Sequence, residues 1–126
     1  VRGYYPGVGW ADYDGNGAPD FYLTNGATQG SRLFQNGAER QRFIKVRLRG
    51  KTNKTNRDAI GAKVWLLDAA TGALHYRQVL SGPGSFELIF GAPAGPYQVE
   101  VSFPGSATAV LRDAVQAGDQ LDIEEP

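Results

Sequence analysis

The residues best suited to chemistry lie in one short segment, where side-chain oxygens recur at alternate positions: Asp12, Asp14, Asn16 and Asp20. Counted from Asp12, they occupy positions 1, 3, 5 and 9 of a calcium-binding loop, with Gly17 at the turn position 6. Three carboxylates held this close together repel one another, and a divalent cation removes the repulsion. The spacing therefore predicts a structural Ca²⁺ site formed by Asp12, Asp14, Asn16, Asp20 and the backbone carbonyl of Ala18.

This loop departs from a helical calcium-binding hand at position 12, where Leu23 replaces the bidentate glutamate. The surrounding run of residues 21–24, Phe-Tyr-Leu-Thr, favours a strand over a helix. Without that glutamate we expect weak binding, with a Kd on the order of 10⁻⁴ to 10⁻³ M, which suits a calcium-rich compartment. The alternative is a turn that holds no ion, because Asp, Asn and Gly also dominate tight turns.

The elements that must position this loop are predicted to be strands. Apolar and polar residues alternate over residues 43–49 and 97–103, so that Ile44, Val46 and Leu48 face a core. Further strands are expected over residues 60–68, 74–80, 86–90, 107–112 and 120–125, separated by turns that contain Gly or Pro. No segment keeps a helical period over about ten residues. The pattern predicts an all-β fold, an antiparallel β-sandwich with an N-terminal calcium-loop hairpin added to it.

The chain is expected to divide into two parts that form one structural unit. Residues 1–36 are predicted to be the calcium-loop hairpin, which is too small to fold alone. Residues 43–125 are predicted to be the sandwich, and the polar residues 37–42 form the seam between them. The strands expected in the first part, over residues 7–11, 20–24 and 32–35, should extend the larger core.

Composition excludes several classes of protein. The 126 residues are enough for one domain with a core of its own, and the absence of Cys excludes disulfides, thiolate metal sites and Cys nucleophiles. No run of residues is long and apolar enough to be a membrane span. The chain starts Val1-Arg2-Gly3, without an initiator Met or an apolar leader, as expected of a mature or excised segment.

Charge is unevenly distributed, although the formal net charge is zero. Residues 32–63 carry most of the Lys and Arg residues, and most of the acids follow them. This basic stretch either pairs with acidic neighbours in its own sheet, which we favour, or offers a ligand surface to an anionic partner through Lys45, Arg47, Arg49 and Arg57. Nucleic acid is not expected as the partner, because no aromatic residues are interleaved with these charges and no recognition helix is available.

Catalytic residues are not expected, and we predict that the chain is not an enzyme. His75 is the only imidazole and lies on a predicted strand, where a solvent-facing His is the ordinary outcome. Ser81 and Ser85 lie in a Gly- and Pro-rich turn that does not resemble a nucleophile elbow. Glu87 and Glu100 would form a glycosidase-type pair only if the fold brought their carboxylates together beside a cleft.

Aromatic and polar residues outside the loop also have two interpretations each. Tyr4, Tyr5 and Trp10 are suited to stacking on sugars, but packing within the hairpin is the commoner role of such residues. Residues 56–58, Asn-Arg-Asp, are either a recognition loop or a structural loop in which Asn and Asp bind nearby backbone.

Two segments resemble known families. Residues 8–36, which contain the calcium loop and the sequence Arg32-Leu33-Phe34-Gln35-Asn36, resemble one FG-GAP (VCBS-type) repeat, the unit of integrin-like β-propellers. Residues 43–125 resemble the ASPIC/UnbV domain, chiefly through the segments 54–64, 81–82, 90–91 and 99–104. The resemblance implies that Asp12, Asp14, Asn16, Asp20 and the Ala18 carbonyl ligate calcium, and it implies an extracellular or cell-envelope location without an established activity. A propeller needs several repeats to close, whereas this chain has one.

Together these observations predict a calcium-stabilised extracellular recognition or adhesion module, the C-terminal part of a longer secreted protein. Its partner would be a protein or a glycan. The alternative is a structural cap of a repeat array that has no ligand of its own. A hydrolase is the third and least favoured possibility.

Overall fold

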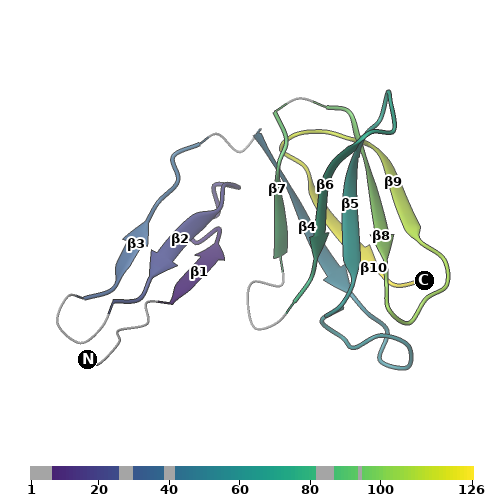
Figure 1. Cartoon of the computed structure of the whole chain (residues 1–126), viewed down its shortest axis with the longest axis horizontal. Coiled ribbons are helices and arrows are strands. Elements are labelled where there is room, and N and C mark those ends of the chain that lie inside the picture. Colours follow the sequence, from purple (N-terminus) through teal and green to yellow (C-terminus); the bar gives the residue numbers. More distant parts are fainter. Residues whose placement is uncertain (1–6, 26–29, 39–41, 82–86, 94) are drawn as a thin grey trace.

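A computed structural model gives the fold and describes residues 7–25, 30–38, 42–81, 87–93 and 95–126. The described part of the chain forms strands and no α-helix, which confirms the all-β prediction (Figure 1). None of it forms a helix with the length and hydropathy that are needed to cross a bilayer. The strands belong to three sheets, of which two form a sandwich.

The first sheet of the sandwich has the order β10-β4-β7, with β4 over Phe43–Arg49, β7 over Glu87–Gly91 and β10 over Gln120–Glu124. The second sheet has the order β6-β5-β8-β9, with β5 over Lys63–Asp68, β6 over Leu74–Val79, β8 over Tyr97–Ser102 and β9 over Val110–Val115. Ile44, Val46 and Leu48 are buried, as their alternation with charged residues predicted. They pack in one cluster with residues from both sheets, including Val64, Leu66, Phe90, Val99 and Val101.

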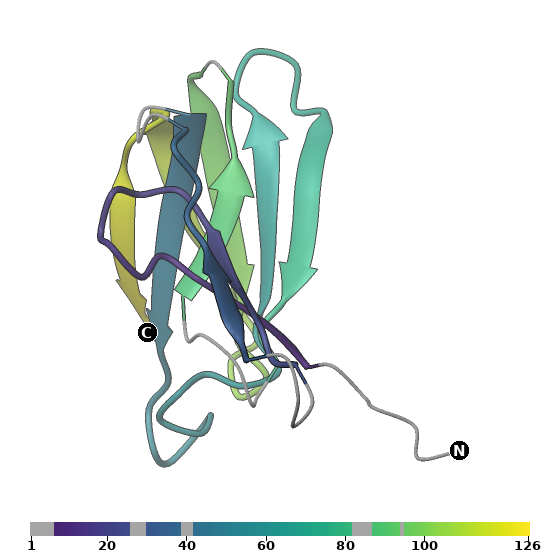
Figure 2. The same ribbon diagram turned by 90° about the vertical axis from the view of Figure 1, so that its left-hand side faces the viewer.

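The N-terminal part forms a sheet of its own, which we call sheet A. It has the order β1-β2-β3, with β1 over Val8–Ala11, β2 over Asp20–Leu23 and β3 over Arg32–Phe34. The prediction that these strands extend the larger core was wrong, because the buried core cluster contains residues of the sandwich alone. The physical reason is that the side chains of β1 and β3 remain exposed, and the strands pair with one another instead of with the sandwich. Figures 1 and 2 place sheet A beside β4 and β7.

Three features of the sandwich differ from the sequence-based expectation. Strand β10 pairs with β4 in a parallel orientation, with Leu121 opposite Val46, whereas the other pairings are antiparallel. Strand β5 begins at Lys63 and not at residue 60, because Ala59 and Gly61 adopt φ angles of 52° and 95° that belong to a turn. The strand expected over residues 107–112 lies at 110–115.

Gly105 is a position at which the fold requires glycine. A Cβ atom there would lie 2.4 Å from the backbone carbonyl carbon of Lys54, and the Gly105 N–H donates to Thr55 Oγ1 at 2.8 Å. We expect Gly105→Ala to lower the thermal midpoint by about 5 to 10 °C, because two backbone segments must move apart. Gly37→Ala, which meets no atom within 4 Å, is the matched control in the same thermal melt. Equal midpoints for the two variants would show that this close approach is not needed.

Candidate metal centre

The predicted metal ligands lie on the loop between β1 and β2. Asp12 follows the last residue of β1, and Asp20 is the first residue of β2, where it pairs with Ala11 across the ladder. This pairing closes the loop and brings its carboxylates together. One carboxylate oxygen from each of Asp12, Asp14 and Asp20 lies within 4.8 Å of the other two. The structure thus gathers three of the five predicted ligands through their carboxylates.

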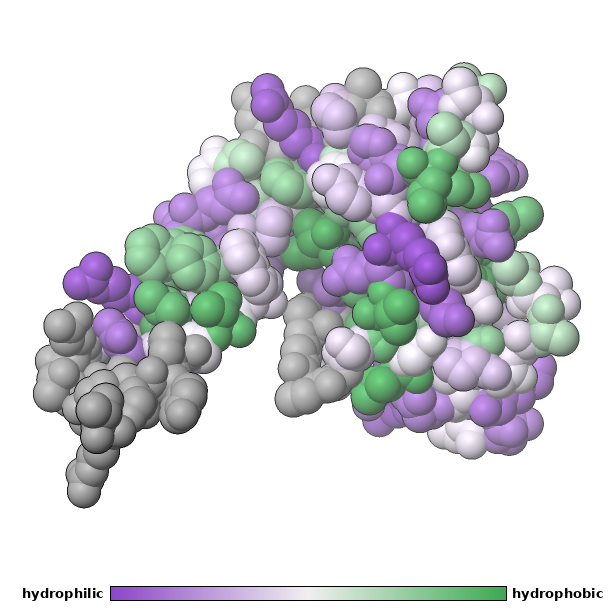
Figure 3. Space-filling model, in the orientation of Figure 1, coloured by the Kyte–Doolittle hydropathy of each residue, from purple (hydrophilic) through white to green (hydrophobic). Residues whose placement is uncertain are grey.

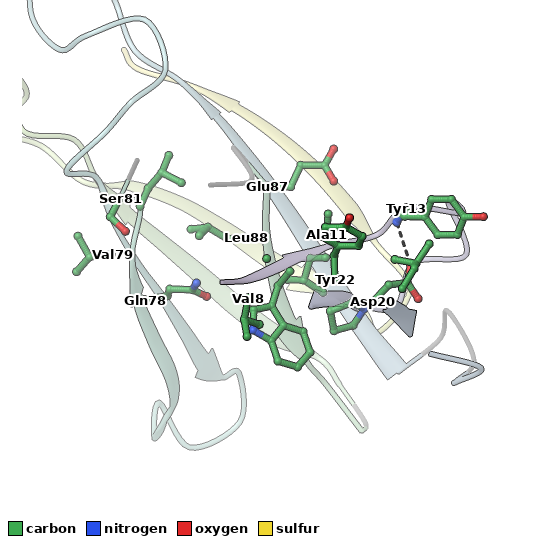
Figure 4. A pocket seen from close by; sticks show the side chains of 16 residues that line it. Val8, Ala11, Tyr13, Asp20, Tyr22, Gln78, Val79, Ser81, Glu87 and Leu88 are labelled. Carbon is green, nitrogen blue, oxygen red and sulfur yellow. Dashed lines mark hydrogen bonds between the residues drawn. The ribbon is translucent and has the colours of Figure 1, made fainter. Parts of the chain in front are cut away.

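The carboxylate of Asp20 is buried and anchors the loop. Its Oδ2 accepts a hydrogen bond of 2.9 Å from the Tyr13 backbone N–H, which is drawn in Figure 4. Its Oδ1 accepts a hydrogen bond of 2.7 Å from the Asn36 backbone N–H, which comes from the segment that follows β3. Asp20 is 1% exposed, so these two donors replace the water that would otherwise solvate the carboxylate.

The carboxylate of Asp14 is exposed and lies at the open side of the loop. Its Oδ1 accepts a hydrogen bond of 2.9 Å from the Asn16 backbone N–H, and its Oδ2 accepts from the side-chain amides of Asn16 and Gln35. The Asn16 backbone N–H and then the Gln35 amide hold the pKa of Asp14 below its ordinary value. Asp14 therefore stays charged near neutral pH, as a calcium ligand must.

Asp12 differs from Asp14 and Asp20, because one oxygen of its carboxylate has no hydrogen-bond partner. Its side chain is fully buried, and its Oδ2 accepts a hydrogen bond of 3.0 Å from the Gly17 N–H and forms an ion pair with Lys45. Its Oδ1 is buried without a hydrogen-bond partner. A buried carboxylate oxygen without a donor is unfavourable, and a cation bound between Asp12, Asp14 and Asp20 would satisfy it. These residues fit a hard divalent cation that prefers oxygen ligands.

The two remaining predicted ligands lie on the same loop. The side-chain carbonyl of Asn16 accepts a hydrogen bond of 2.7 Å from the Ala18 N–H, and its amide donates to the Asn36 carbonyl at 3.0 Å. Ala18 is fully buried. Sequence reasoning did not assign structural roles to Gln35 and Asn36, although both belong to the segment that resembles the FG-GAP repeat.

Two of the three basic side chains of β4 are paired within their own sheet, as the interpretation that we favoured predicts, and the third is paired outside it. Arg47 forms an ion pair with Glu87 on β7 and lies 3.9 Å from an oxygen of Asp122 on β10. Arg49 lies 3.7 Å from Glu124, its register partner on β10. Lys45 instead contacts Asp12 and lies 3.8 Å from Glu87.

The loop that follows β4 is partly structural. The Asn56 side chain accepts a hydrogen bond from the Ile60 N–H and donates one to the Ile60 carbonyl, each at 2.9 Å, as expected of a structural loop. Arg57 and Asp58, both of which the structure describes, lie beside Arg47 and Arg49 along a hollow of about 390 Å³. Of the four residues of the predicted ligand surface, Arg47, Arg49 and Arg57 thus line one hollow, and Lys45 contacts Asp12 instead.

A larger groove of about 770 Å³ separates sheet A from the sandwich. Apolar side chains line both sides of it, with Trp10, Tyr22 and Leu33 from sheet A and Val79, Leu80 and Leu88 from the sandwich. Figure 3 shows exposed hydrophobic surface over both parts, and Figure 4 shows Tyr22 and Leu88 across the groove. Trp10 is 60% exposed, and its ring contacts Phe21, which stacks on Phe34. Tyr4 and Tyr5 lie outside the described residues.

The residues weighed for catalysis are dispersed. His75 lies on the exposed strand β6, where its ring contacts those of Tyr76 and Tyr97. Glu87 and Glu100 belong to strands of different sheets, and Glu87 is paired with Arg47. Ser81 lines the groove between the two parts, and Ser85 lies outside the described residues.

Sequence reasoning missed a buried polar cluster around Glu125. The Glu125 carboxylate is 1% exposed and accepts hydrogen bonds from the backbone N–H groups of Lys51 and Thr55 and from the hydroxyls of Thr55 and Ser106. The alternation that buries Ile123 places Glu125 on the same face, and this was the available indication. The cluster joins the loop after β4 to the end of the chain.

No family model matches the chain, and no curated protein matches it significantly. The resemblance to FG-GAP and ASPIC/UnbV sequences therefore rests on the segments quoted above.

Proposed function

We propose that the chain is a calcium-stabilised extracellular recognition module. In this proposal Ca²⁺ binds the carboxylates of Asp12, Asp14 and Asp20 together with the side-chain oxygen of Asn16 and the carbonyl of Ala18. The observation that carries the proposal is the convergence of three carboxylates, one of which has a buried oxygen without a partner. The ion would be structural: it would neutralise the loop and fix the register of β1 and β2.

We assign the binding of a partner to the exposed surfaces of the 12–20 loop and of the sandwich. Three arginines and three acids line the hollow after β4, namely Arg47, Arg49, Arg57, Asp58, Asp122 and Glu124. A carboxylate or sulfate group of a partner would exchange with these acids, because a guanidinium forms paired hydrogen bonds with such anions. A protein or an acidic glycan is the kind of partner that carries these groups. An extracellular or cell-envelope location fits a weak calcium site, since such a site fills only where calcium is abundant.

A thermal melt tests the calcium site directly. Calcium at tenfold its Kd is expected to add about 1.4 kcal/mol to the free energy of unfolding and to raise the midpoint by about 4 °C, relative to excess chelator. Asp14→Ala should abolish this rise, because it removes the exposed ligand. Asp58→Ala, which removes a carboxylate elsewhere, should keep the rise. A midpoint that calcium leaves unchanged in the unaltered protein would overturn the proposal.

A structural cap is the second candidate, and the exposed apolar side chains of sheet A favour it. Val8, Trp10, Tyr22 and Leu33 are all at least 44% exposed, although they belong to one small sheet. A sheet with exposed apolar residues is usually covered by a neighbouring unit. A glycan and protein binding screen, run with and without calcium, separates the two candidates. Consistent absence of binding would favour the cap, and calcium-dependent binding would favour the recognition module.

A further inference from the structure

Lys45 connects the sandwich to the calcium loop. It lies on β4 with its side chain 14% exposed, and its ammonium forms an ion pair with Asp12 of the loop. The same ammonium lies 3.8 Å from Glu87, which belongs to the neighbouring strand β7. Lys45 therefore places one positive charge between an acid of sheet A's loop and an acid of the sandwich.

This ammonium already neutralises one oxygen of the Asp12 carboxylate. The carboxylate of Asp12 is fully buried, and Lys45 and the Gly17 N–H both act on its Oδ2. Its Oδ1 is left without a partner beside Asp14 and Asp20. A divalent cation among these three carboxylates would stand within a few ångström of the ammonium, and two positive charges at that separation repel each other strongly.

We propose that Lys45 is a tethered counter-ion that competes with calcium for Asp12, so that calcium binding and the docking of sheet A against the sandwich oppose each other. This proposal rests on the calcium site proposed above. When calcium enters, Lys45 leaves Asp12 and stays with Glu87, and the ion pair between the two parts is lost. The coupling is reciprocal, since whatever strengthens docking must weaken calcium binding by the same factor.

The competition has a consequence for the groove between the two parts. Its walls come from sheet A on one side and from β6 and β7 on the other, so its width depends on how sheet A docks. Loss of the Lys45–Asp12 ion pair would free sheet A to move and would open the groove. Calcium would in this way control access to the apolar side chains that line it.

Calcium affinity is the first test. The Kd for calcium is measured from the backbone amide shifts of Gly15 and Gly17 in the unaltered protein and in Lys45→Met. We expect Lys45→Met to bind calcium about tenfold more tightly, because the competing charge is gone. Lys45→Gln should give the same gain and serves as a second variant if the first folds poorly. Lys45→Arg retains the charge and should bind as the unaltered protein does.

Arg49→Met is the matched control for net charge. Arg49 lies on the same face of β4 and pairs with Glu124 instead of the loop. Equal calcium affinities for Lys45→Met, Arg49→Met and the unaltered protein would show that Lys45 does not compete with calcium. The proposed calcium site would be unaffected by that result. If the amide shifts of the unaltered protein do not change at millimolar calcium, both proposals are wrong: the calcium site and the competition of Lys45 with calcium.

Docking is the second test. The chain has no native Cys, so spin labels are introduced at Ser31→Cys and Ala70→Cys. Both positions are exposed; Ser31 directly precedes β3 of sheet A, and Ala70 lies between β5 and β6 of the sandwich. We expect calcium to broaden the distance distribution between the labels, and Lys45→Met to broaden it without calcium. A distribution that saturating calcium leaves unchanged would overturn the coupling between calcium and docking.

Discussion

Replacing Asp20 with alanine is expected to remove the calcium response and to open the loop even without calcium. The Asp20 carboxylate accepts hydrogen bonds from the Tyr13 and Asn36 backbone N–H groups and is 1% exposed. Each hydrogen bond to a charged acceptor contributes about 2 kcal/mol, so we expect the hydrogen exchange of both amides to accelerate about thirtyfold. The measurement is amide exchange followed by NMR in the presence of chelator.

Two further variants separate the proposed ligand role of Asp20 from its structural role. Asp14→Ala removes a proposed calcium ligand and leaves both hydrogen bonds to Asp20, so the Tyr13 and Asn36 amides should remain protected. Asp20→Asn retains one acceptor, and we expect one of the two amides to lose protection because it faces the NH₂ group. Unchanged exchange in Asp20→Ala would contradict the anchoring role.

The second large effect is expected from Glu125→Ala, which should lower the thermal midpoint by roughly 10 °C. The substitution leaves the Lys51 N–H, the Thr55 N–H and the hydroxyls of Thr55 and Ser106 without their acceptor. Unsatisfied donors in a buried position are costly, and these donors hold two loops to β10. Glu124→Ala is the matched control: its side chain is 71% exposed, so its midpoint should change little. A similar change of the thermal midpoint in Glu125→Ala and Glu124→Ala would contradict the role of Glu125 as a buried acceptor.

The same cluster predicts how stability depends on pH. Burial raises the pKa of Glu125, but the hydrogen bonds from Lys51, Ser106 and Thr55 outweigh burial and hold that pKa below its ordinary value. A carboxylate with a lowered pKa in the folded state contributes stability above its unfolded pKa and loses it as pH falls through the folded pKa. Thermal melts below about pH 4.5 should therefore show a steeper loss in the unaltered protein than in Glu125→Gln.

Sheet A lies beside the sandwich with an apolar groove between them, and Lys45 bridges the two parts through Asp12. In the proposed module, the exposed surface would depend on whether calcium occupies the loop and on how sheet A docks. The calcium melt reports the first, and the spin-label distances report the second.

The sequence alone determined the features that depend on neighbours along the chain. The alternation of Ile44, Val46 and Leu48 predicted their burial because side chains of a strand point to opposite faces in turn. The oxygens of the 12–20 segment were predicted to converge because a short loop with Gly at its turn folds back on itself, and the structure brings Asp12, Asp14 and Asp20 together. Both patterns are local, so they are visible in the order of residues.

Only the tertiary structure decided which distant segments meet. The basic residues of β4 look alike in sequence, yet Arg47 and Arg49 pair with acids of β7 and β10, whereas Lys45 contacts Asp12. Strand β10 lies parallel to β4, and sheet A pairs within itself, because strand partners are chosen by packing and register over the whole chain. Glu124 and Glu125 are neighbours of the same type, and only the placement of the loops around β10 makes one of them a buried acceptor.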